Sequence, residues 1–160
     1  MNEGLRIRHE WLQTNYAPPQ EVFPLLCPVR EADWVPGWQY RMIYSQSGVA
    51  ELGCVFTTPN EDGSDTTWMV TEYDPAALHI AFAWVNPGLV AAEIRIHLEA
   101  KSTQETTARI QYTYTGLTER GNREVERLDA PWFAHKMKSW EAAINHYLRT
   151  GSKIDTTGWK

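Results

Sequence analysis

A chain of 160 residues with 42% hydrophobic and 22% charged residues has the composition of one globular domain rather than a disordered segment. The net charge of −5, without any run of basic residues, argues against nucleic-acid binding, and no apolar stretch reaches the roughly 18 residues that a membrane span needs. The two cysteines, Cys27 and Cys54, fit neither a metal motif nor a disulfide framework. We therefore expect a soluble, cytoplasmic protein without a signal peptide or inserted membrane segment.

Alternating apolar and polar residues predict a half-buried strand over residues 5–13. Two short helices should follow, over residues 21–26 and 30–34, because Pro24 and Pro28 interrupt the helical register between them. The sequence then has the pattern of six strands joined by short turns. Their expected ranges are 38–45, 49–58, 66–73, 78–85, 89–100 and 106–117.

A long helix is predicted at the end, over residues 124–148, where the apolar period lengthens to that of a helix. Its apolar face consists of Phe133, Met137, Trp140, Ile144 and Leu148. On the other, polar side we expect Lys136, Lys138, Glu141 and Asn145. Pro131 must kink or restart this helix, because proline lacks the N–H that a helix interior uses. Gly151 should end it.

The predicted order is β-α-α-β6-α, an α+β fold. A meander of this size must bury one face, and the only large partner is the C-terminal helix. Because antiparallel sheets twist, the seven-stranded sheet should curve around that helix, with the two short helices at its mouth. We expect one domain over residues 1–150 and a tail over residues 151–160.

Four stretches carry a resemblance to a known family: VFPLLCPVREADWVPGW (22–38), TWMVTEYDP (67–75), TARIQYTYTGL (107–117) and FAHKMKSWEAAINHYL (133–148). The chain resembles the START-like superfamily, also called SRPBCC, helix-grip or Bet v 1-like, and within it the bacterial polyketide cyclase/dehydrase-like members. The resemblance implies a deep apolar cavity between the sheet and the long helix. It implies no catalytic motif and no cofactor, because this fold hosts lipid carriers, hormone receptors, cyclases, oxygenase domains and chaperone activators.

Eight Trp and seven Tyr are unusual in a chain of this length, and they fit either an aromatic core or the walls of a cavity. From the alternation and the expected fold, the predicted lining of a ligand cavity is Phe23, Leu26, Trp34, Trp38, Trp68, Phe82, Trp84, Tyr112, Tyr114, Phe133, Met137 and Trp140. Among these, Tyr112 and Tyr114 bring hydroxyl groups to an apolar interior, where each needs a partner or a ligand.

Glu72 is the one acid that alternation places inward, after Trp68 and Val70. At a strand end near the rim of the cavity, its carboxylate could bind a polar end of the ligand or act as a general base with a raised pKa, which makes it the catalytic candidate. Outside the core it would instead pair with an arginine. Trp34 and Trp38, around a Val-Pro-Gly segment, form either an aromatic lip of the cavity or a packing corner.

Other polar residues do not form a site in the sequence. The histidines lie on different elements, and His135 and His146 stand about 16 Å apart along the helix, too far to share a metal. Arg30, Glu31 and Asp33 are expected on a solvated helix surface.

Three functions remain open. The first is binding of a small hydrophobic, lipid-like or aromatic molecule between the sheet and the helix. The second is a cyclase- or dehydrase-type enzyme that uses the same cavity. The third is a protein-interaction module with a filled core, which needs an exposed apolar patch. The sequence leaves open the ligand, the oligomeric state and whether the cavity is open or filled.

Overall fold

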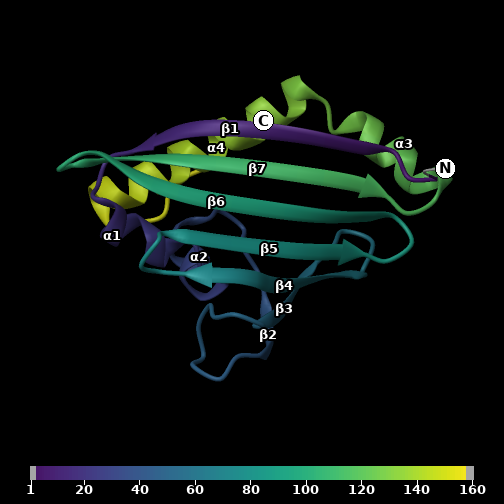
Figure 1. Ribbon diagram of the computed structural model, residues 1–160, viewed down its shortest axis with the longest axis horizontal. Helices are drawn as coiled ribbons and strands as arrows, with labels where there is room; N and C mark the ends of the chain where they lie inside the picture. Colours follow the sequence, from purple (N-terminus) through teal and green to yellow (C-terminus); the bar gives the residue numbers. More distant parts are fainter. Residues whose placement is uncertain (1–2, 158–160) are drawn as a thin grey trace.

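Seven strands pair antiparallel into one sheet within residues 3–157, the part of the chain that the computed structural model describes (Figure 1). Their order is β1-β7-β6-β5-β4-β3-β2, so the strands from β2 to β7 form a meander and β1 closes the edge beside β7. The strands are β1 (Arg6–Asn15), β2 (Arg41–Tyr44), β3 (Val55–Pro59), β4 (Asp65–Asp74), β5 (His79–Asn86), β6 (Val90–Ser102) and β7 (Glu105–Gly116).

The helices cover one face of this sheet (Figure 1). Between β1 and β2 lie α1 (Pro19–Val22), the 3-10 helix η1 (Phe23–Leu25) and α2 (Pro28–Trp34), and after β7 come α3 (Glu119–Arg127) and α4 (Ala130–Thr150). The predicted α+β class and the sheet wrapped around a long C-terminal helix are confirmed. Residues 1–2 of the expected domain and 158–160 of the expected tail lie outside the described residues.

Pro131 restarts the C-terminal helix, which was one of the two predicted outcomes. The carboxylate of Asp129 accepts the backbone N–H of Trp132 at 2.9 Å and so begins α4. The earlier segment is a separate helix that begins at Glu119 rather than at residue 124, because Thr118 caps it. Gly121 lets α3 approach the sheet closely, since a Cβ there would lie 1.8 Å from the carbonyl oxygen of Leu89.

The two strands expected over residues 38–45 and 49–58 pair antiparallel, but both are shorter than expected and no short turn joins them. Only Arg41–Tyr44 and Val55–Pro59 form strands, and an irregular loop separates them. The loop is organised by Glu51, whose carboxylate accepts the hydroxyl of Ser45 at 2.8 Å and the backbone N–H of Ser47 at 3.1 Å. Within the loop, these side-chain bonds stand in place of the backbone ladder that longer strands would have formed.

The core lies between the sheet and α4. Strand pairing sets rows of side chains across the inner face of the sheet, and each row joins residues directly opposite one another in neighbouring strands. One row consists of Phe56, Trp68, Trp84, Ala92, Tyr114 and Ile7. The next row includes Phe82, Ile94, Tyr112 and His9. From α4, Phe133, Met137 and Ile144 are buried against this face.

Candidate functional site

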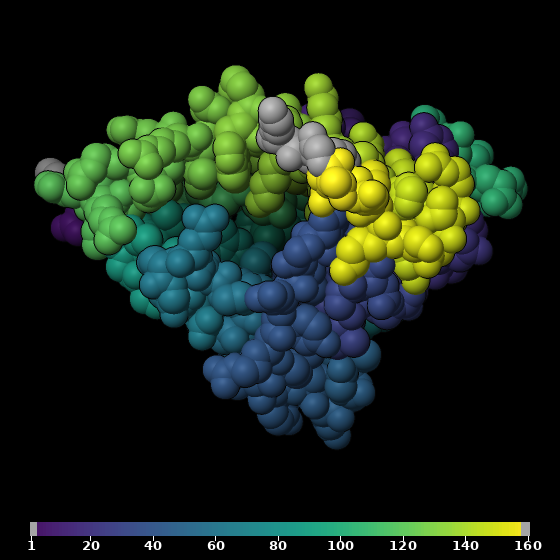
Figure 2. Space-filling view, turned by 180° about the vertical axis from the view of Figure 1, so that it is seen from behind, coloured from purple at the N-terminus to yellow at the C-terminus, as the bar shows by residue number. Residues whose placement is uncertain are grey.

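A hollow opens into the interior between the helices and the sheet. Figure 2 shows it from behind, between the green segment of α3 and the start of α4 and the blue segment around β3 and β4. Trp68 and Trp84 face inward, in the same row as the buried Phe56, yet both are only half-buried. Their incomplete burial indicates that side chains do not fill all of the space over this part of the inner face. A neighbouring pocket of about 290 Å³ lies between the end of α2 and α4.

We call this region the chamber and define it by five half-buried side chains: Glu31, Trp68, Trp84, Tyr112 and Lys136. Ring contacts through Tyr114, the ammonium of Lys136 over Tyr112 and the charge of Glu31 near Tyr112 connect them. They come from α2, β4, β5, β7 and α4. The chamber thus depends on the tertiary fold, because no two of these residues share an element.

The aromatic walls are held by ring contacts and by bonds at their polar ends. The rings of Phe56 and Trp68 are stacked with centres 5.4 Å apart, and those of Trp68 and Trp84 lie 6.0 Å apart. The indole N–H of Trp68 donates to the hydroxyl of Thr58 at 3.0 Å. Trp38 meets Trp68 edge to face, and its own N–H donates to the carbonyl of Pro28 at 2.8 Å. These walls are rigid and present ring faces rather than polar groups.

Two tyrosines of β7 bring hydroxyl groups into this interior, as predicted from alternation. Tyr114 is 1% exposed, and its hydroxyl has no hydrogen-bond partner among the residues that the structure describes. Burial raises the pKa of both Tyr112 and Tyr114, and the nearby charge of Glu31 raises that of Tyr112 further. Both phenols therefore stay neutral, and Tyr114 has a hydroxyl free to bond to a ligand.

Lys136 points into the chamber, so the expectation that it lies on the polar side of the helix is wrong. Its Nζ lies 4.6 Å from the ring centre of Tyr112 and 5.3 Å from that of Trp132. Within residues 3–157 it makes no hydrogen bond and no salt bridge, and burial lowers its pKa to about 8. The signal was present in the sequence, because Lys136 follows Phe133 by three residues and precedes Trp140 by four.

The other residues expected on the polar side of this helix behave differently from one another. Glu141 and Asn145 face β1, where Glu141 accepts the N–H of Thr14 at 3.0 Å and Asn145 donates to its carbonyl at 3.0 Å. Lys138 is exposed, as expected. Hydrogen bonds from Glu141 and Asn145 therefore hold this side of α4 to the edge strand β1.

Glu31 was expected on a solvated surface and is instead enclosed. Its side chain retains some accessible surface, yet burial raises its pKa to about 8. Glu31 precedes the buried Trp34 by three residues and so shares its inward side of α2. Its neighbours Arg30 and Asp33 form a salt bridge with each other at 3.0 Å, and Asp33 is exposed as expected.

Glu72 does not face inward, and the expectation from alternation is wrong. A bulge between Val70 and Glu72 adds one residue to β4, so Val70 lies opposite Phe82 and Glu72 lies opposite Ala81. On the outer face its carboxylate bonds to Arg95 at 3.1 Å and to His79. The bond to His79 and the charge of Arg95 lower its pKa. Glu72 therefore pairs with an arginine outside the core, which is the second of the two arrangements considered from the sequence.

The predicted lining residues all lie in the interior but not all at the chamber. Trp34 and Met137 are fully buried, and the indole N–H of Trp34 donates to the carbonyl of Leu25 at 3.0 Å, which makes it a packing corner. Phe23 and Leu26 line a separate pocket of about 190 Å³. The rest pack around the chamber or its floor: Trp38, Trp68, Phe82, Trp84, Tyr112, Tyr114, Phe133 and Trp140.

No metal centre is found in the described part of the chain, where no three His, Cys, Asp or Glu side chains gather. His9 is the histidine nearest the chamber. It stacks on Phe133 with ring centres 4.7 Å apart, and its Nε2 bonds to the carbonyl of Leu128 at 2.6 Å. Among residues 3–157, none of the helices is long and apolar enough to cross a membrane.

Solved structures share this fold. Norcoclaurine synthase from Thalictrum flavum, a point mutant in complex with a transition-state analogue, matches with a TM-score of 0.68 at 13% identity, over 95% of this chain and 100% of that one. Ara h 8.0201 matches with a TM-score of 0.63 at 15% identity, over 91% and 99% of the two chains. The protein XoxI from Bacillus cereus matches at 0.64 and 14%, over 89% and 96%.

These likenesses define the class of fold, which is the helix-grip, Bet v 1-like fold of the SRPBCC proteins. At such low identities they carry the fold alone. No protein-family model matches the chain, and no curated protein matches it either.

Proposed function

We propose that the protein binds a small, largely aromatic molecule in the chamber. The observation that carries this proposal is the half-buried state of Trp68 and Trp84 on the inner face of the sheet, beside the fully buried Phe56. A filled core would bury all three rings equally. Rigid rings offer flat apolar surface to a ligand without collapsing into the space themselves, and the indole N–H of Trp68 is already bonded to Thr58.

The unpaired hydroxyl of Tyr114 supports the proposal. A buried polar group without a partner costs free energy, and a ligand that bonds to it would recover that cost. The comparisons add a supporting precedent, because a norcoclaurine synthase of the same fold has been crystallised in complex with dopamine and hydroxybenzaldehyde, both small aromatic molecules.

Two measurements test binding. Native mass spectrometry of freshly purified protein detects a retained molecule near one equivalent. Calorimetric titration with naphthalene-2-carboxamide, a neutral aromatic probe, should give a single site with a negative heat-capacity change, as expected for burial of apolar surface. The absence of both a retained molecule and any heat of binding up to millimolar probe would contradict the proposal.

A wall variant locates the site. Trp84→Leu keeps an apolar residue but removes the ring face, so the affinity for the probe should fall about tenfold. Tyr44→Leu is the matched control, because Tyr44 is 62% exposed on β2. Equal affinity in both variants would place the probe elsewhere.

Acid–base chemistry on the bound molecule, of the cyclase or dehydrase kind, is the second candidate. Glu31 and Lys136 both have a pKa of about 8 and both border the chamber, which is the condition that general acid–base catalysis requires near neutral pH. Its test is substrate turnover in Glu31→Gln, which should be abolished while ligand binding persists.

A further inference from the structure

The chamber holds an ammonium group without a matching anion. Lys136 Nζ lies over the rings of Tyr112 and Trp132, and no carboxylate of residues 3–157 comes within salt-bridge distance of it. Aromatic faces compensate a desolvated cation only in part. A cation held in this way therefore remains available to an anion that enters.

Glu31 does not act as the internal counter-ion. An ion pair with Lys136 would lower the pKa of the carboxyl and raise that of the amine, whereas burial moves both in the opposite directions. At pH 7 the carboxyl of Glu31 is therefore protonated and Lys136 is mostly charged. The chamber then presents one positive charge, on Lys136, and the neutral O–H groups of Glu31 and Tyr112, while the hydroxyl of Tyr114 is buried.

Resting on the proposed function, we infer that the ligand is an aromatic anion, such as a carboxylate, whose charged oxygens pair with Lys136 while its ring lies against Trp68 and Trp84. The ammonium of Lys136 can only donate and lies over aromatic rings, so a ligand that pairs with it must bring an oxygen acceptor. A cationic ligand would meet the ammonium of Lys136 with no ionised carboxylate beside it, which disfavours amines.

Three probes with one ring system test this inference by calorimetry at pH 7: naphthalene-2-carboxylate, naphthalene-2-carboxamide and 2-naphthylmethylammonium. The carboxylate should bind about tenfold or more tightly than the carboxamide, as for a hydrogen bond to a charged group, and the ammonium should bind most weakly. Equal affinities, or a preference for the ammonium, would overturn the inference while leaving the proposed function intact. Failure of all three to bind would instead sink the proposed function.

Lys136→Met tests the residue itself, because methionine keeps the length and apolar stem but removes the charge. It should abolish the preference for the carboxylate and leave the affinity for the carboxamide within about twofold. Lys138→Met is the matched control, being exposed two residues further along α4. A preference that survives in Lys136→Met would assign the anion to another group, and thermal unfolding of each variant verifies that it is folded.

The preference for the carboxylate over the carboxamide should also depend on pH. Tyr112 of β7 faces Lys136, Glu31 of α2 lies near Tyr112, and His9 of β1 stacks on Phe133, which Tyr112 also contacts. Above about pH 8 Lys136 loses its proton and Glu31 becomes an anion, and both changes weaken carboxylate binding. The carboxylate affinity should fall at least tenfold between pH 7 and pH 9.5 while the carboxamide affinity stays level. A flat profile for the carboxylate would contradict the role of Lys136.

Discussion

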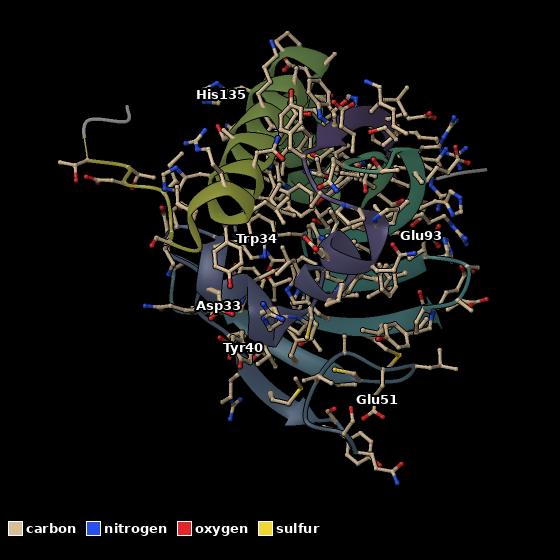
Figure 3. All side chains as sticks on the ribbon, turned by 90° about the vertical axis from the view of Figure 1, so that its left-hand side faces the viewer. Asp33, Trp34, Tyr40, Glu51, Glu93 and His135 are labelled. Carbon is tan, nitrogen blue, oxygen red and sulfur yellow. The ribbon has the colours of Figure 1, made fainter. Side chains whose placement is uncertain are left out.

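Trp34 and Trp140 meet edge to face, with ring centres 4.9 Å apart, and this contact joins α2 to α4. Glu31 lies one helical turn before Trp34, and Lys136 lies one turn before Trp140. The buried indole of Trp34 lies beneath α4, while the neighbouring Asp33 points outward (Figure 3). A contact between two apolar rings thus fixes the relative position of the two titratable groups at the chamber.

Trp34→Phe should lower the free energy of unfolding by about 2–4 kcal/mol, because it removes buried volume and leaves the carbonyl of Leu25 without its donor. Chemical denaturation measures this loss. Trp132→Phe is the control, since the side chain of Trp132 is 37% exposed, and should cost less than about 1 kcal/mol. A similar cost for both variants would mean that Trp34 has no special place in the packing.

Tyr114→Phe should leave the stability unchanged or raise it by about 1 kcal/mol, because the deleted hydroxyl has no partner in the described residues. Thr106→Val is the contrasting change. Thr106 is fully buried and donates to the carbonyl of Ala17 at 2.7 Å, so its loss should cost about 1–2 kcal/mol. Denaturation curves compare the two variants, and a clear loss of stability in Tyr114→Phe would show that its hydroxyl is bonded after all.

The fold could be predicted because its signals are local and repeated. Alternation indicated the inward-facing Tyr112 and Tyr114 of β7, and Pro131 marked the break before α4. The loop between β2 and β3 could not be predicted, because the carboxylate of Glu51 organises it through bonds to residues near in sequence but outside any periodic pattern.

The polar part of the site was harder to find than its aromatic walls. Glu31 and Lys136 occupy inward positions at helical spacing from Trp34 and Trp140, but charged residues are rarely buried, so the pattern favoured a solvated surface. Only the packing of α2 against α4 and β7 encloses them. For Glu72 the error was the reverse, because a residue predicted to face inward lies on the outer face. A single bulged residue reverses the face of every later side chain in the strand.

Glu72→Gln should therefore leave ligand binding unchanged and alter the free energy of unfolding by less than about 1 kcal/mol, since its bonds to Arg95 and His79 lie on a half-exposed outer face. Calorimetry with naphthalene-2-carboxylate and urea denaturation provide the two readouts. A loss of binding comparable to that of Lys136→Met would show that Glu72 takes part in ligand binding, contrary to its position on the outer face of the sheet.

Glu31→Gln should remove a specific pH dependence of stability. The folded-state pKa of Glu31 is about 8 and its ordinary value is 4.5, so between these values the unfolded chain loses a proton that the folded protein retains. Stability must then fall as pH rises through this window, by on the order of 3 kcal/mol between pH 4.5 and pH 7. Glutamine cannot ionise, so the free energy of unfolding of the variant does not show this fall.

The difference between the unfolding free energies of the Glu31→Gln variant and the native protein isolates this effect from the other carboxyl groups. It should be level below about pH 4.5, rise in favour of the variant up to about pH 8, and then level off. Glu126→Gln, at an exposed position of α3, should give a difference that stays flat across the same range. A flat difference for Glu31→Gln as well would mean that the carboxyl of Glu31 is hydrated, and that the chamber carries no protonated acid at neutral pH.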